Sequence, residues 1–135
     1  MMEKVILCID DEKIILDSLR MQLRRELGYQ YGLELAENAE DGLALMEELT
    51  DSGVKVIVIL TDWLMPGMKG DEFLIKVHQR FPGIVKIMLS GYVDDESIAK
   101  AYKEANLFKY LRKPWESEEL VSTIRQGLTL LDEKA

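Results

Sequence analysis

The feature that most constrains the fold is a fivefold alternation between short apolar runs and longer segments with helical spacing of apolar residues. Short runs rich in β-branched residues are typical of buried strands, whereas apolar residues three or four apart are typical of amphipathic helices. The expected strands are 5–9, 33–36, 54–62, 84–90 and 107–111. A chain that alternates in this way predicts an α/β fold, in which right-handed crossovers build a parallel sheet with helices on both faces.

Helical patterns fill the segments after each strand. The first pattern ends at Gly28, and Asn38 and either Asp94 or Asp95 are candidate N-caps for the second and fourth helices. We expect the last helix to begin near Glu116. The core positions expected on the later helices include Phe73 or Leu74, Val77, Ile98, Ala101, Tyr102, Ala105, Leu120 and Ile124. The strand 54–62 is apolar on both faces and is therefore expected at the centre of the sheet.

Composition narrows the classes of protein that fit. A length of 135 residues suits one domain, and 47% hydrophobic residues can form a normal core. The net charge of −8 argues against DNA or an anionic membrane surface as a partner. The single cysteine, Cys8, lies in an apolar run and predicts a buried thiol in a reducing compartment. Because no apolar run is long enough to cross a bilayer, we expect a cytoplasmic protein.

Polar residues close four of the five expected strands. Asp10 and Asp11 follow the first strand, Asp62 ends the third, Ser90 ends the fourth, and Lys113 stands two residues after the fifth. In an open α/β sheet, ligands bind outside the carboxyl ends of the strands. Taken singly, these residues have plainer interpretations as helix caps, turn residues or solvated charges. Their joint occurrence at four strand ends predicts a site at one edge of the sheet.

The chemistry of these residues indicates a metal-assisted phosphoryl site. Two carboxylate charges about 4 Å apart repel by about 4 kcal/mol at an effective dielectric constant near 20, and a divalent cation removes that conflict. Ligands that are all oxygen favour Mg²⁺ over Zn²⁺. Ser90 and Lys113 add donors that can bind phosphoryl oxygens. Asp62 beside them is a candidate acceptor that would form an acyl phosphate.

These residues make the sequence resemble bacterial two-component response-regulator receiver domains of the chemotaxis-receiver type. The resemblance covers essentially the whole chain, and its carriers are Asp10-Asp11, TDWLMPGMKG (61–70), LSGY (89–92) and KYLRKPW (109–115). It implies a doubly wound, flavodoxin-like sheet with strand order 2-1-3-4-5 and five helices on its two faces. It also implies one receiver domain over residues 1–135, either complete or part of a larger multidomain protein.

The resemblance assigns a role to each residue at the metal. Asp62 would be the phosphoacceptor. Asp11, Asp62 and the backbone carbonyl of Leu64 would hold Mg²⁺, for which Mn²⁺ is a substitute, and Asp10 would act directly or through water.

A second group of residues would act on the phosphoryl group. Ser90 would bond to it and Lys113 would pair with it, with a cis peptide bond between Lys113 and Pro114. Tyr110 would be the switch aromatic that turns inward when Ser90 moves. This change would alter the surface formed by the fourth helix, the fifth strand and the fifth helix.

The implied function is phosphorelay signal transduction. A histidine kinase or phosphotransfer protein would donate the phosphoryl group, and an effector domain or protein would read the altered surface, without direct contact to nucleic acid or membrane. Such a domain is a switch rather than an enzyme, since it catalyses only its own phosphorylation and dephosphorylation. The sequence leaves the cognate kinase, the output and homodimer formation open.

Three other functions compete with this interpretation. A Mg²⁺-dependent phosphatase with an Asp nucleophile needs a second acid two positions later, where this chain has Leu64. A nucleotide- or flavin-binding domain needs a phosphate-binding turn after the first strand, where this chain has Asp10, Asp11 and Glu12. A structural module that takes no phosphate remains to be separated by experiment. We expect Trp63 to pack near the site and His78 to be a plain exposed helix residue.

Overall fold

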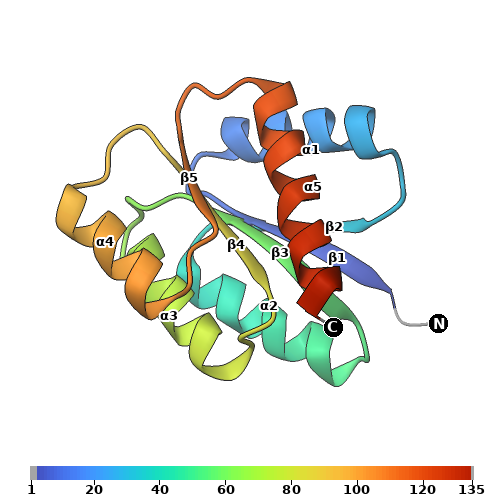
Figure 1. The fold of residues 1–135 in the computed structure, drawn as a ribbon, viewed down its shortest axis with the longest axis horizontal. Helices are drawn as coiled ribbons and strands as arrows, with labels where there is room; N and C mark the ends of the chain where they lie inside the picture. The colour runs from blue at the N-terminus through green and yellow to red at the C-terminus, as the bar shows by residue number, and fades with distance from the viewer. Residues whose placement is uncertain (1–2, 135) are drawn as a thin grey trace.

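The computed structural model describes residues 3–134, in which strands and helices alternate (Figure 1). In chain order the elements are β1 (Lys4–Ile9), α1 (Lys13–Leu27), β2 (Gly32–Ala36), α2 (Ala39–Asp51), β3 (Lys55–Thr61), α3 (Gly70–Arg80), β4 (Val85–Ser90), α4 (Asp95–Glu104), β5 (Lys109–Arg112) and α5 (Ser117–Lys134). The α/β class expected from the alternation is confirmed.

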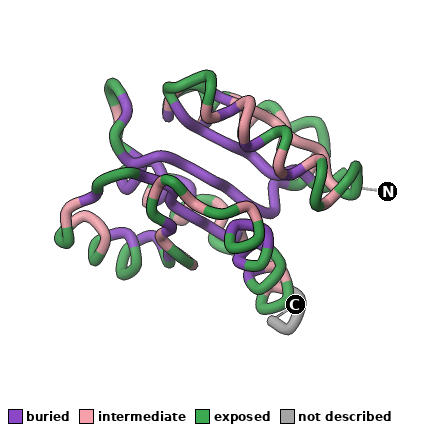
Figure 2. The backbone as a smooth tube through the Cα atoms, turned by 90° about the horizontal axis from the view of Figure 1, so that it is seen from above, coloured by how far each residue is buried: buried purple, intermediate pink, exposed green. Residues whose placement is uncertain are grey.

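The five strands form one parallel sheet in the order β2-β1-β3-β4-β5. This is the doubly wound order that the resemblance implied. β3 lies at the centre, and six of its seven residues are buried. Figure 2 shows buried backbone concentrated in the strands between the two helical layers. The apolar character of 54–62 on both faces is therefore explained by helices above and below it.

Each face of the sheet is covered by its own helices. α1 and α5 lie on one face, and α2, α3 and α4 lie on the other (Figure 1). Alternate residues of each strand point into different cores, so that Ile6 and Cys8 pack with α1 and α5 while Leu7 and Ile9 pack with the opposite layer. Cys8 is fully buried as expected, and burial raises the pKa of its thiol to about 12.

The predicted helix boundaries hold at three caps. Gly28 ends α1 with a φ of 60°, a conformation that glycine adopts without steric cost. The Asn38 side chain accepts a hydrogen bond from the Asp41 N–H at 2.7 Å, and the Asp94 side chain accepts one from the Ser97 N–H at 2.7 Å. Asp94, rather than Asp95, is therefore the cap of α4.

Three expectations are wrong in detail. β5 begins at Lys109 instead of position 107, because the Leu107 N–H bonds to the Ala101 carbonyl and so belongs to the turn after α4. Tyr102 is 43% exposed rather than buried, because its hydroxyl reaches the edge of β5 and accepts the Tyr110 N–H at 3.2 Å. His78 is half-buried, since its Nδ1 lies 3.1 Å from Lys86 Nζ.

Within residues 3–134, no helix combines the length and the apolar character needed to cross a bilayer.

Candidate functional site

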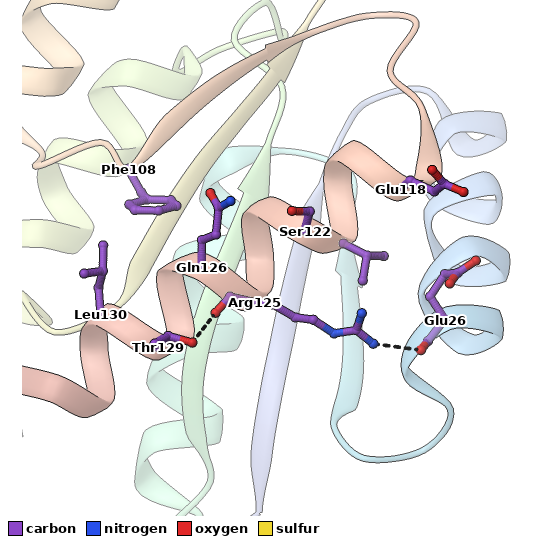
Figure 3. A pocket seen from close by; sticks show the side chains of 9 residues that line it. Glu26, Phe108, Glu118, Ser122, Arg125, Gln126, Thr129 and Leu130 are labelled. Carbon is purple, nitrogen blue, oxygen red and sulfur yellow. Dashed lines mark hydrogen bonds between the residues drawn. The ribbon is translucent and has the colours of Figure 1, made fainter.

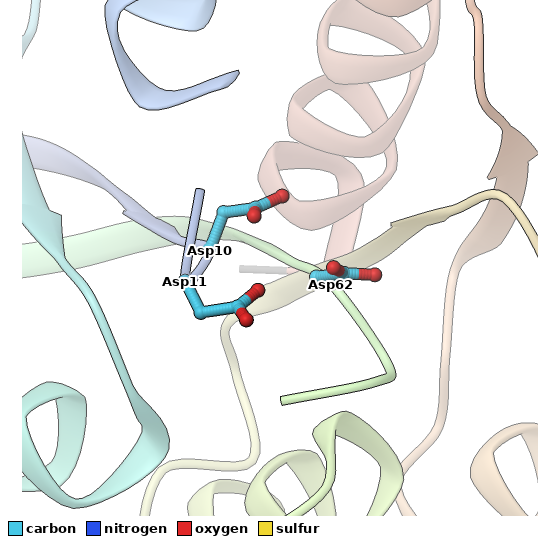
Figure 4. A group of neighbouring side chains, drawn as sticks. All are labelled: Asp10, Asp11 and Asp62. Carbon is cyan, nitrogen blue, oxygen red and sulfur yellow. The ribbon is translucent and has the colours of Figure 1, made fainter. Parts of the chain in front are cut away.

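Three carboxylates meet where β1 and β3 end. Asp10 and Asp11 follow β1 and Asp62 follows β3, and one oxygen from each lies within 4.8 Å of the others (Figure 4). Asp10 and Asp62 are buried, whereas Asp11 is exposed. The topology explains this cluster, because β1 and β3 are parallel neighbours whose carboxyl ends lie side by side.

Lys113 completes the cluster from the segment after β5. Its Nζ donates to Asp10 Oδ2 at 2.8 Å and to Asp62 Oδ2 at 3.3 Å. The side chain is only 16% exposed, and the peptide bond from Lys113 to Pro114 is cis. One ammonium therefore bridges two buried acids contributed by different strands.

The electrostatics of this group are set by burial and by the bridge. Burial raises the pKa of the Asp10 carboxyl, and the nearby charge of Asp62 raises it further, although Lys113 and the Glu12 N–H oppose the shift. Burial alone would lower the pKa of the Lys113 ammonium, but its hydrogen bonds and the charges of Asp10 and Asp62 raise it overall. Lys113 therefore stabilises the ionised form of Asp10 against the cost of burial.

The remaining oxygens of the buried acids are held by backbone amides. Asp10 Oδ1 accepts from the Glu12 N–H at 2.9 Å, and Asp62 Oδ1 accepts from the Trp63 N–H at 2.7 Å.

The segment after Asp62 passes close to Gly70: a Cβ at Gly70 would lie 2.1 Å from the Asp62 carbonyl oxygen. Only glycine fits at that position, which explains the last glycine of the 61–70 segment.

Ser90 and Tyr110 lie at the end of β4 and on β5. The Lys113 N–H and the Tyr110 hydroxyl both donate to the Ser90 carbonyl, at 3.0 Å and 3.1 Å. The Ser90 hydroxyl itself donates to the carbonyl of Tyr92 at 3.2 Å. The structure therefore joins Ser90 to the Lys113 segment through its backbone, while its side chain is engaged by the loop that follows β4.

The expected role of Leu64 concerns its backbone carbonyl rather than its side chain. The side chain of Leu64 is 60% exposed, and a metal-binding role for its carbonyl stays a prediction. Sequence reasoning did not find the Glu12 and Trp63 amides as partners of the acids. A signal was present, because a residue that follows an acid at a strand end is well placed to donate its backbone N–H to that acid.

A hollow of about 640 Å³ lies elsewhere, along α5 (Figure 3). Its lining includes Glu26, Phe108 and Leu130, together with Arg125, whose guanidinium donates to the Glu26 carbonyl at 3.4 Å. The strand-end acids do not contribute to its lining. The clustered chemistry of the molecule is thus at the strand ends rather than in this hollow.

The sequence profile of the response regulator receiver domain matches residues 6–125. The chain belongs to the response regulator receiver family. It is accordingly a signalling domain of two-component systems, and the matched residues include the acid cluster, Ser90 and Lys113.

Proteins of known sequence or structure resemble this chain along most of its length. The hydrogenase transcriptional regulatory protein HoxA of Cupriavidus necator is 36% identical over 126 residues, which make up 93% of this chain. A CheY-like receiver domain from Methanospirillum hungatei is 32% identical with a TM-score of 0.86, covering 98% of this chain and 99% of that one. The solution structure of the beryllofluoride-activated NtrC4 receiver domain dimer is 26% identical with a TM-score of 0.80, covering 94% and 98%.

The similarity to HoxA is confined to part of that protein. The aligned region covers 24% of its length, so this receiver domain spans about a quarter of the curated relative.

Proposed function

We propose that this receiver domain accepts a phosphoryl group on Asp62 from a histidine kinase or phosphotransfer protein. The observation that carries the proposal is the convergence of Asp10, Asp11 and Asp62 on one point, with Lys113 bridging two of them. An ordinary strand-end acid would not need two further carboxylates beside it, because each adds repulsion. The cluster is costly for the fold and is best explained by a function.

The proposed transfer forms one bond and breaks another. An oxygen of the Asp62 carboxylate attacks phosphorus, and the bond from phosphorus to the donor's nitrogen or oxygen breaks with its electron pair leaving on the donor. Hydrolysis removes the phosphoryl group: water attacks phosphorus, the acyl phosphate bond breaks, and Asp62 is regenerated as a carboxylate with release of phosphate. The only catalysis proposed is therefore of the domain's own phosphorylation and dephosphorylation.

The residues at the site fit Mg²⁺. The ligand atoms available from Asp10, Asp11 and Asp62 are all oxygens within 4.8 Å of one another, and exposed Asp11 leaves the cluster open to water. Mg²⁺ prefers a few carboxylates plus waters, and Mn²⁺ is a workable substitute. We assign Asp11, Asp62 and the Leu64 carbonyl as ligands, with Asp10 acting directly or through water. When bound, the metal would neutralise the acids and the charge on the transferred group.

The chain's own residues would hold the product. Lys113 Nζ, already 3.3 Å from Asp62 Oδ2, would pair with a phosphoryl oxygen, and the Ser90 hydroxyl would turn from the Tyr92 carbonyl to bond another. The Tyr110 hydroxyl donates a hydrogen bond to the Ser90 carbonyl. A movement of Ser90 would shift this carbonyl, and Tyr110 would then turn inward with it. Phosphorylation would thus bias the α4-β5-α5 surface between two packings.

The partners follow from this switch. We propose that an effector domain or protein reads the α4-β5-α5 surface, that the domain acts in the cytoplasm, and that it makes no direct contact with nucleic acid or membrane. The dimeric, beryllofluoride-activated NtrC4 receiver supports a homodimer as one form of the activated state. We treat residues 1–135 as one receiver domain, which in a longer protein would be joined to an effector.

The test is phosphorylation by a small phospho-donor. The wild-type protein, incubated with acetyl phosphate and Mg²⁺, should gain the mass of one phosphoryl group, and the gain should be absent from Asp62→Asn and from samples with EDTA. Mg²⁺ titration should change the tryptophan emission, to which Trp63 contributes directly after the acceptor, and Asp62→Asn should weaken that response. A wild-type mass that stays unchanged under these conditions would favour a structural module over the switch.

A further inference from the structure

We propose that Tyr92 is a positioning residue that latches Ser90 in the resting state by packing its ring against Trp63. The inference rests on the proposed function, because Ser90 is taken to bind the phosphoryl group. It adds a residue outside the acid cluster that sets how readily this domain switches.

The resting hydroxyl of Ser90 is already engaged. Ser90 Oγ donates to the Tyr92 carbonyl at 3.2 Å, within the loop between β4 and α4. A hydroxyl has one proton to donate, so the same group cannot donate to this carbonyl and to a phosphoryl oxygen together. Whatever holds Tyr92 in place therefore stabilises the arrangement in which Ser90 is turned away from the phosphoryl group.

The Tyr92 ring packs against one neighbouring aromatic side chain. It meets Trp63 edge to face, with ring centroids 6.3 Å apart and an interplanar angle of 64°. Tyr92 is nevertheless 66% exposed, which means that most of its surface gains nothing from burial. The contact with Trp63 is thus the feature of the structure that explains the position of this side chain.

Trp63 is a fixed partner for that ring. It is 6% exposed, its Nε1 donates to the buried carboxylate of Asp71 at 3.0 Å, and Lys69 Nζ lies 4.9 Å from its ring centroid. Its backbone N–H donates to Asp62 Oδ1 at 2.7 Å. The latch therefore connects the residue after the acceptor with the loop that follows Ser90.

The size of the effect follows from the strength of such contacts. An edge-to-face aromatic pair contributes about 0.5–1.5 kcal/mol, which biases an equilibrium by about 2- to 10-fold. In the proposed latch the pair is made in the resting state and not in the switched state, so removing it should favour the switched state by that factor. Binding of Mg²⁺ alone does not require Ser90 to move and should be unaffected.

The experiment measures binding of beryllofluoride, as a phosphoryl analogue, in the presence of saturating Mg²⁺. Trp115→Phe serves as the background so that the emission comes from Trp63. Into it we would place Tyr92→Ala, which removes the ring, and Tyr92→Phe, which keeps it. Tyr29→Ala is the matched control, since Tyr29 is an 87% exposed tyrosine on the loop after α1. Urea unfolding of each variant checks that it is folded.

We expect Tyr92→Ala to bind beryllofluoride about 2- to 10-fold more tightly, while Tyr92→Phe and Tyr29→Ala match the background protein and the Mg²⁺ affinity is the same in all. Equal or weaker beryllofluoride binding by Tyr92→Ala would overturn the latch, as would a parallel change in its Mg²⁺ affinity. If the background protein bound Mg²⁺ but no beryllofluoride, the proposed function would fail and the latch with it. Binding that is equal in every variant would refute the latch alone.

Discussion

A half-buried lysine, Lys113, and a fully buried one, Lys86, lie against opposite ends of β4, and their ammonium groups have different partners. Lys113, whose N–H donates to the carbonyl of Ser90 at the end of the strand, directs its ammonium to Asp10 and Asp62. Lys86, near the start of the strand, is fully buried, and its Nζ contacts His78 Nδ1 at 3.1 Å and the Ile84 carbonyl at 3.0 Å.

The difference in partners reverses the sign of each pKa shift. Burial lowers the pKa of the Lys86 ammonium to about 8, because a neutral ring and a carbonyl do not replace the solvation that the charge loses. At Lys113 the neighbouring carboxylates overcome the same penalty and raise the pKa. The ammonium charge of Lys113 is therefore stabilised by the carboxylates that it bridges. The ammonium charge of Lys86 has no such partner and destabilises the folded state.

The largest expected difference between the two lysines is in phosphorylation. Lys113→Met removes a donor aimed at the developing phosphoryl charge and should slow phosphorylation by acetyl phosphate about 10²- to 10³-fold. Lys86→Met removes a charge of the same kind at the other end of the strand and should change the rate less than twofold. Both rates can be followed by intact-protein mass. Similar rates in the two variants would show that the bridge to Asp10 and Asp62 has no part in the transfer.

The second prediction concerns stability in alkali. The pKa of Lys86 is lower in the folded protein, about 8, than its ordinary value of 10.5. Between these values the unfolded chain binds more protons, so the free energy of unfolding should rise with pH across this window, by at most about 3 kcal/mol at 1.36 kcal/mol per pKa unit. Urea unfolding from pH 7 to pH 10.5 measures the rise. The same series on Lys86→Met should lack this contribution. An identical pH dependence in the variant and the wild type would mean that folding does not lower the pKa of Lys86.

The contrast also separates what the sequence predicts from what it does not. Asp62, Ser90 and Lys113 all stand within two residues of a strand end, so recognising the strands was enough to bring them to one edge. The environment of Lys86 has no such signal, because its partner His78 depends on how α3 packs on β4. For the same reason the contact between Trp63 and Tyr92 was out of reach: it depends on the conformations of two loops.

The third prediction uses Mg²⁺ as a second cation for the acids. Because Mg²⁺ is expected to bind only the folded site, it should stabilise the protein by about 2.7 kcal/mol at a concentration one hundred times its dissociation constant. Lys113→Met should keep this gain or increase it, since the acids then lack their ammonium, and Lys86→Met should leave it unchanged. Thermal unfolding with Mg²⁺ and with EDTA provides the measurement. If Mg²⁺ failed to stabilise Lys86→Met but still stabilised Asp62→Asn, the metal would not bind at the acid cluster.

The smallest expected effect belongs to His78. Burial lowers the pKa of its ring, and the charge of Lys86 lowers it further. The unfolded chain therefore binds more protons just below pH 6.5, and this part of the stability should be lost as the pH falls from 6.5 through the folded pKa. The contact adds to burial and charge repulsion: in the tautomer with an unprotonated Nδ1, that nitrogen can accept from Lys86 Nζ, whereas a protonated ring would set two donors against each other. Urea unfolding between pH 7 and pH 5 should show a weaker acid dependence in His78→Gln, and in Lys86→Met the same substitution should change that dependence less, because the opposing donor has been removed.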